Sequence, residues 1–268
     1  MGNFVQRAIT GILFIGIIGG ALLLGPVTYA VIFACVIVIA THEYCRIARA
    51  AGLVPHVMLS TAINVVAFAL GFMIYYANVD PRLLLLIICL VWIVFLTELL
   101  SHNKLPFQNI AVTLLSCIYV GLPFSLFNLL AFKTGQYDWQ PIVGLFVMGW
   151  INDTAAYIFG VTLGRHKLLE RVSPKKTVEG FVGGVVATLV VAYLFHYFAA
   201  YELWLCLVSG LIISVIGTCG DLIESMFKRS VNFKDSGSLL PGHGGILDRF
   251  DSIIFASPLV SIIYYFFV

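Results

Sequence analysis

The chain has 268 residues, of which 61% are hydrophobic and 10% are charged, and its mean hydropathy is +1.03. Soluble domains carry about 25% charged residues, so this composition excludes a water-soluble globular protein and indicates an integral membrane protein. The formal net charge of only +2 gives no electrostatic basis for binding nucleic acid.

Nine hydrophobic stretches follow one another along the chain. A helical membrane span needs about 20 apolar residues, and apolar runs such as residues 83–88 lack the alternation of a transmembrane β-barrel strand. The stretches lie at 8–25, 27–41, 57–77, 83–99, 110–132, 141–163, 180–200, 203–220 and 252–268. The sequence therefore predicts an all-α integral membrane protein, a polytopic helical bundle with about nine transmembrane helices.

The distribution of charge indicates which part of the chain carries function. Of the 28 charged residues, 18 lie between Asp153 and Asp251. We interpret residues 1–140 as N-terminal transmembrane helices with a scaffold, dimer-forming or lipid-facing role. Residues 141–268 are interpreted as C-terminal transmembrane helices with two catalytic loops, 164–180 and 221–251.

The basic residues predict the orientation of the chain. With nine spans, the N-terminus and the even-numbered connections share one side, and thirteen of the fifteen Lys and Arg residues lie there. Only Arg82 and Lys133 lie on the other side. Basic residues concentrate in cytoplasmic loops, so we expect a multi-pass protein of the cytoplasmic (inner) membrane. The N-terminus and both polar loops are placed in the cytoplasm, and the C-terminus outside.

Polar residues in or near the spans are the first candidates for function. Asn152 and Asp153 lie inside the sixth stretch, where an Asp costs about 2.5–3.5 kcal/mol on insertion scales. The alternative is a polar pair that joins two helices. Glu43, Glu98 and Asn109 lie near span ends and are expected at the membrane interface.

The connection 164–180 is basic and contains a helix-start signal. Ser173 followed by Pro174 fits an N-cap and a first helical position. Lys175 and Lys176 would then lie at the positive end of a helix, which favours a bound phosphate. The alternative is attraction of these lysines to anionic lipid headgroups.

The connection 221–251 holds two groups of carboxylates. If the eighth helix continues past Gly220, one of its faces carries Asp221, Glu224, Ser225 and Lys228. Asp248 and Asp251 share a face at the start of the ninth helix. Such an oxygen-only ligand set suits Mg²⁺. The alternatives are carboxylates that cap a helix N-terminus and a self-neutralising solvated loop.

A glycine-rich turn at 242–245 adds weight to a site, because glycines let backbone amides approach an anion closely. No Walker-type phosphate loop is present in the sequence. Taken together, the residues favour phosphoryl or nucleotidyl transfer onto a lipid at a membrane-surface site that holds Mg²⁺ and polyphosphate.

Residues 225–251 resemble the signature of the phosphatidate cytidylyltransferase (CDP-diacylglycerol synthase) family. The signature is Ser-x-x-Lys-Arg, four residues, Lys-Asp, then His-Gly-Gly and Asp-Arg-x-Asp. These 27 residues carry it without departure, as Ser225, Lys228-Arg229, Lys234-Asp235, His243-Gly244-Gly245 and Asp248-Arg249-Phe250-Asp251. Asn152-Asp153-Thr154, Gly164-Arg165 and residues 173–180 are also similar to the family, so the resemblance covers about the C-terminal 45% of the chain.

The resemblance implies the Mg²⁺-dependent reaction of CTP with phosphatidic acid to give CDP-diacylglycerol and pyrophosphate. It implies these catalytic residues: Asp221, Lys228, Arg229, Asp248, Arg249 and Asp251. The implied metal ligands are Asp221, Asp248 and Asp251. The implied substrate-binding residues are Asn152, Asp153, Ser173, Lys175, Lys176, Thr177, Glu179, Ser225, Lys234, Asp235, His243, Gly244 and Gly245.

Two other functions stay open at this point. One is a CTP-dependent polyprenol or other lipid kinase, which would transfer the γ-phosphate of CTP. The other is an ion-coupled transporter, which would need paired charges across several spans, and only Asp153 clearly qualifies. The sequence also leaves open a second metal ion, an assisting monovalent cation and assembly as a homodimer.

Overall fold

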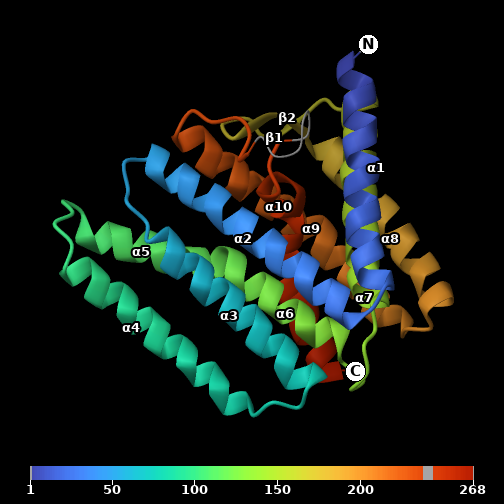
Figure 1. The fold of residues 1–268 in the computed structure, drawn as a ribbon. Coiled ribbons are helices and arrows are strands. Elements are labelled where there is room, and N and C mark those ends of the chain that lie inside the picture. The colour runs from blue at the N-terminus through green and yellow to red at the C-terminus, as the bar shows by residue number, and fades with distance from the viewer. Residues whose placement is uncertain (1, 238–243, 268) are drawn as a thin grey trace.

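The computed structural model describes residues 2–237 and 244–267, without the side chains of residues 2–8 (Figure 1). The elements are α1 (Gly2–Leu23), α2 (Pro26–Ala50), α3 (Val57–Tyr76), the 3₁₀ turn η1 (Pro81–Leu85), α4 (Leu86–Leu99), α5 (Pro106–Ser116), the π-helical turn η2 (Cys117–Gly121), α6 (Leu122–Ala131), α7 (Gln140–Thr162), β1 (Lys167–Leu169), β2 (Ser173–Thr177), α8 (Val178–Ala199), α9 (Leu203–Ser230) and α10 (Leu247–Phe267).

The predicted helical membrane protein is confirmed. Each of the nine hydrophobic stretches coincides with a helix or a continuous helical segment, such as η1 with α4 or α5 with η2 and α6. Within the described residues, eight of these segments are long and apolar enough to cross a membrane, and the described apolar part of α1, Ile9–Leu23, is shorter. Large apolar side chains such as Leu24, Phe107 and Phe198 are exposed, as expected of surfaces that face lipid.

Local sequence sets several of the helix starts. Proline occupies the first or second position of α2, α5 and α7, where its missing N–H is not needed by the helix. Thr177 caps α8, since its Oγ1 accepts a hydrogen bond of 3.1 Å from the N–H of Gly180.

The polar connections gather at one end of the bundle. The start of α1, the β1–β2 hairpin and the connection from α9 to α10 all lie at this end, which we call the site end, and the C-terminus lies at the opposite end (Figure 1). The two strands are antiparallel, with Lys167 opposite Thr177 and Leu169 opposite Ser173. This small sheet is an addition to the predicted all-helical fold.

An aromatic core fixes the beginning of α10. Phe250 is fully buried, and its ring makes edge contacts with Phe124 (5.2 Å between centroids), Phe146 (5.5 Å) and Phe14 (5.8 Å). Each such pair contributes about 0.5–1.5 kcal/mol beyond its buried area. Phe250 lies between Asp248 and Asp251 in the sequence, so this packing holds the turn that carries both carboxylates.

Candidate active site

The last turns of α9 carry the first group of site residues. The helix continues past Gly220 to Ser230, so the condition for a shared face is met, and Asp221, Glu224, Ser225 and Lys228 lie at three- and four-residue spacing. Ser225 donates a hydrogen bond of 3.3 Å from Oγ to Oδ1 of Asp221. The Lys228 ammonium lies 3.2 Å from Oε1 of Glu224.

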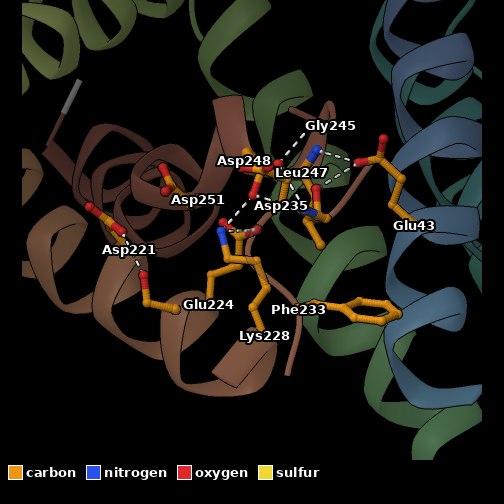
Figure 2. A network of polar contacts seen from close by, with 12 residues as sticks. Glu43, Asp221, Glu224, Lys228, Phe233, Asp235, Gly245, Leu247, Asp248 and Asp251 are labelled. Atoms are coloured by element: carbon orange, nitrogen blue, oxygen red, sulfur yellow. Dashed lines mark hydrogen bonds and ion pairs between the residues drawn. The ribbon is translucent and has the colours of Figure 1, made fainter. Parts of the chain in front are cut away.

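Lys228 connects α9 to α10 through a buried ion pair. Its Nζ lies 2.5 Å from Oδ1 of Asp248, and both side chains are less than 10% exposed (Figure 2). Glu224 is completely buried, and neither of its oxygens accepts a hydrogen bond from the described residues. One buried ammonium group therefore pairs with two buried carboxyl groups, those of Glu224 and Asp248.

Asp248 has a different set of partners from the one expected of a metal ligand. Besides Lys228, it accepts hydrogen bonds from the backbone N–H of Ser236 (2.9 Å) and of Gly245 (2.7 Å). These donors occupy both carboxylate oxygens. Asp248 thus joins the α9–α10 connection to Lys228 and satisfies backbone amides just before α10, which is close to the capping alternative.

Asp251 and Asp221 make up a second carboxylate group. The two side chains lie near each other on α10 and α9 (Figure 2), and Asp153 of α7 is close enough to both to interact electrostatically. Lys176 of β2 forms an ion pair with Asp221. Three acids therefore share this cluster with one directly paired lysine.

Two cavities adjoin at this cluster, and both are lined by Asp153 and Asp221. The first has a volume of about 570 Å³ and is lined by α7, β1, β2, α8 and α9. Its polar lining comes from Asn152, Asp153, Lys167, Lys175, Lys176, Thr177, Thr218 and Asp221. The second, of about 490 Å³, is lined by Thr10, Gly11, Phe14, Ile15, Trp150, Asp153, Thr154, Asp221, Lys228, Asp235, Asp248, Arg249 and Asp251.

The connection 164–180 does not form the predicted helix start at Ser173. Residues Ser173–Thr177 are strand β2, and α8 begins only at Val178. The physical reason is a competing cap: the Thr177 hydroxyl takes the N-cap position, and pairing with β1 holds the preceding residues extended. Lys175 and Lys176 still line the first cavity, but from a strand and not from a helix N-terminus.

Several residues expected to be catalytic or substrate-binding lie outside both cavities. Glu179 accepts hydrogen bonds from the backbone N–H of Arg165 (3.0 Å) and from His166, so it ties the hairpin to α8. Arg229 is exposed and donates to the carbonyl of Phe233 at 3.2 Å. The other expected residues outside both cavities are Ser173, Ser225, Lys234, Gly244 and Gly245. His243 lies outside the described residues.

The neighbouring residues Asn152 and Asp153 have different surroundings in the structure. Asn152 is buried, and its Oδ1 lies against Gly184 of α8, where a side chain would collide with it. Asn152 thus packs α7 on α8, as in the alternative of a polar helix contact, and it also reaches the wall of the first cavity. Asp153, its neighbour, lines both cavities.

Glu43, Glu98 and Asn109, which are expected at the membrane interface because they lie near span ends, are all at most 8% exposed and so are buried within the protein. Their depth in the membrane stays a prediction. Each is buried with hydrogen-bond partners: Asn109 donates to Glu98 at 2.9 Å, and Glu43 accepts from the connection before α10. Glu43 and Arg46 contact the site from α2 and, with the cavity-lining Lys167, are additions to the predicted site. For Glu43 and Arg46, the only sequence feature that could have indicated a place at the site is a charge near the end of a span.

A magnesium ion fits the chemistry of the carboxylate cluster. Asp153, Asp221 and Asp251 offer only oxygen ligands, and among the described residues Lys176 is the one cation that forms an ion pair with any of the three. Among the described residues no three His, Cys, Asp or Glu side chains already converge on one point. Mg²⁺ is usually bound through one or two carboxylates together with substrate phosphates, not by an all-protein cage, so this arrangement suits an ion that binds with a nucleotide.

Comparison with known proteins gives the same classification. The model of the "Cytidylyltransferase family" matches residues 5–267. Proteins named phosphatidate cytidylyltransferase from Staphylococcus haemolyticus and Staphylococcus aureus are 43% identical to this chain, and one from Staphylococcus saprophyticus is 44% identical. Each match covers 179 residues, which are 66% of this chain and 67% of the relative. The chain therefore belongs to the cytidylyltransferase family and is a nucleotidyltransferase.

Proposed function

We propose that this protein is a phosphatidate cytidylyltransferase, which transfers CMP from CTP to phosphatidic acid and releases pyrophosphate. The observation that carries the proposal is the pair of cavities that share Asp153 and Asp221. A transfer between two substrates requires two binding spaces that meet at the reacting atoms. Both cavities are lined by charged residues and also by apolar side chains of helices with lipid-facing surfaces, as a nucleotide and a lipid require.

The residues proposed to hold Mg²⁺ are Asp221 and Asp251, with Asp153 as the third acid of the cluster. When bound there, the ion would neutralise charge on the α-phosphate and on the leaving pyrophosphate. Asp248, expected in this group, is proposed instead to position Lys228, because its oxygens are already occupied by Lys228 and two backbone amides.

The basic side chains are proposed to bind and orient the phosphates. Lys175 and Lys176 enter the first cavity from β2, and Lys228 and Arg249 enter the second. The ion pair of Lys176 with Asp221 supports a position of this lysine where the two cavities meet. Arg229 and Lys234 are exposed and outside both cavities, so a phosphate role for them requires contact with a substrate headgroup at the membrane surface.

The proposed transfer needs positioning more than proton removal. A phosphatidate oxygen attacks the α-phosphorus of CTP in line, a new P–O bond forms, and the bond to the bridging oxygen of pyrophosphate breaks. The attacking phosphate is already ionised at neutral pH, so no general base is assigned. The side chains of the site hold the two phosphates together and balance their charge.

The multi-pass chain is proposed to lie in the cytoplasmic membrane with its N-terminus and site in the cytoplasm. The support is the concentration of Lys and Arg in the connections that share the side of the N-terminus. The hairpin and the α9–α10 connection lie at the same end of the bundle as the start of α1 (Figure 1). Assembly as a homodimer stays a prediction.

The function is tested by identifying the products of the purified protein in mixed micelles. With CTP, Mg²⁺ and phosphatidic acid we expect CDP-diacylglycerol by mass spectrometry and one pyrophosphate per lipid product. Removal of Mg²⁺ with a chelator should stop the reaction, and its addition should restore it. Phosphorylation of a polyprenol with release of CDP, and no product from phosphatidic acid, would identify a lipid kinase and refute the proposal.

A further inference from the structure

Glu43 of α2 is a buried carboxylate that the proposed reaction does not use. It is 8% exposed and accepts three hydrogen bonds from the connection between α9 and α10. The donors are the hydroxyl of Ser236 (3.1 Å) and the backbone N–H groups of Ile246 (3.1 Å) and Leu247 (2.8 Å). The last two are the amides at the start of α10, so α2 supplies the N-terminal cap of a helix about 200 residues away.

Arg46, one turn further along α2, binds the first part of the same connection, at Asp235 and Ser236. Its guanidinium donates hydrogen bonds to the carbonyl oxygens of Ser236 and of Asp235, the latter at 3.4 Å. The guanidinium also lies 5.6 Å from the centre of the Phe233 ring, within the range of a cation–π contact. Glu43 and Arg46 together form what we call the α2 clamp.

At two positions that contact the α2 clamp, only glycine leaves enough room for the side chain of Glu43. A Cβ atom on Gly237 or on Gly245 would collide with the carboxylate of Glu43. The sequence led us to expect an anion near the glycines that precede Asp248. In the structure, Gly245 lies between two carboxylates of the protein. It leaves room for the carboxylate of Glu43 and donates its N–H to that of Asp248.

The clamp is continuous with the charged residues of the site. Ser236 donates its hydroxyl to Glu43 and its N–H to Asp248, and Asp248 is paired with Lys228 (Figure 2). We propose that Glu43 is a positioning residue: through Ser236 and the start of α10 it sets where Asp248 and Lys228 lie in the second cavity. As a statement about catalysis, this inference rests on the proposed function.

Substitution of Glu43 by Gln tests the clamp with little change of shape. Glu43 accepts from Ile246 and Leu247 on different oxygens, and Gln keeps only one acceptor oxygen, so its N–H₂ group must face one of these two amides and that hydrogen bond of the cap is lost. We expect kcat to fall by about 10–100-fold, the range typical of residues that orient a first ligand shell. Glu43→Asp keeps the charge and should have a kcat between those of wild type and Glu43→Gln.

Glu98→Gln is the matched control. Glu98 is also a buried acid of the N-terminal half, 2% exposed, and its partners are Asn109, Asn103 and His56. Both variants are expected to lower the midpoint of thermal unfolding in detergent. Only Glu43→Gln should lower the kcat of the folded protein.

Amide hydrogen exchange gives a readout that does not depend on activity. Exchange at Ile246, at Leu247 or at both should accelerate in Glu43→Gln, and exchange at both should stay unchanged in Glu98→Gln. Unchanged exchange at these amides, or a loss of kcat that only follows the loss of thermal stability in both variants, would overturn the inference. If the wild type forms no CDP-diacylglycerol, the proposed function fails, and exchange still decides whether the clamp exists.

Discussion

Among single residues, Asp221 lies where the two cavities meet and faces three different charges. Lys176 is paired with it, and Asp153 and Asp251 repel it. No other residue of the described chain lines both cavities except Asp153. The conservative substitution at this position is therefore the sharpest test of the site.

Asp221→Asn keeps the size of the side chain and removes its charge. We expect kcat to fall by at least about 100-fold, since residues that merely orient metal ligands already account for about 10–100-fold. The protein should still insert and purify, because the side chain is only partly buried. The measurement is CDP-diacylglycerol formation at saturating CTP, with Glu202→Gln, an exposed acid outside both cavities, as the control. Wild-type turnover in Asp221→Asn would contradict the proposed role of Asp221 in catalysis.

Lys228 is expected to stabilise the fold as well as the site. Lys228→Met leaves Glu224 and Asp248 buried without their cation, and breaking a buried pair in this way costs about 3–5 kcal/mol. In Lys228→Met/Glu224→Leu one of the two buried carboxyl groups that lost their partner is also removed. The double variant should therefore unfold at a higher temperature than the single variant, as measured by thermal unfolding in detergent. Equal unfolding midpoints for the single and the double variant would contradict the proposal that Lys228 stabilises the buried carboxyl group of Glu224.

Among the elements, the β1–β2 hairpin shows where local sequence signals compete. By sequence alone, a helix could begin at Ser173 and Pro174 or at Thr177. In the structure, the hydroxyl of Thr177 caps α8 by accepting a hydrogen bond from the N–H of Gly180. Thr177 prevails because the residues before it pair with β1, which a helix from Ser173 would prevent. A sequence pattern cannot rank two adjacent caps when long-range pairing decides between them.

Thr177→Val removes this cap and keeps the shape of the side chain. We expect a loss of about 0.5–2 kcal/mol, the usual cost of losing an N-cap, measured as a lower midpoint of thermal unfolding. Thr177→Ser retains the hydroxyl and should unfold close to the wild type. Thr162→Val is the matched control, because Thr162 is exposed near the end of α7 and its hydroxyl only bonds back to Ile158. Equal effects at Thr177 and Thr162 would show that the cap is unimportant.

At the scale of the whole molecule, hydropathy was sufficient to predict the helices but not their contacts. Apolar runs of membrane length must form helices, since lipid cannot satisfy the backbone, and the nine stretches became helices accordingly. The face shared by Asp221, Glu224 and Lys228 was predictable because helical spacing is fixed. The contact of Glu43 with Leu247 joins residues 204 apart, and no local pattern specifies such a contact.

The orientation of the whole chain gives a further prediction. Arg171 in the hairpin turn should face the cytoplasm, and Arg82, before α4, should face the opposite side. Single cysteines at these two positions, in a background without the six native cysteines, should react with an impermeant maleimide from opposite sides of sealed cells and inverted vesicles. Labelling of both positions from one side would contradict the predicted topology.

The central claim is that the site transfers a nucleotidyl group to a lipid, and isotope transfer tests it most directly. The purified protein is given phosphatidic acid, Mg²⁺ and CTP labelled either at the α- or at the γ-phosphate. We predict that label from the α-position reaches the lipid and that label from the γ-position leaves in pyrophosphate. Lipid labelled only from the γ-position, or lipid without label from folded protein, would contradict the claim.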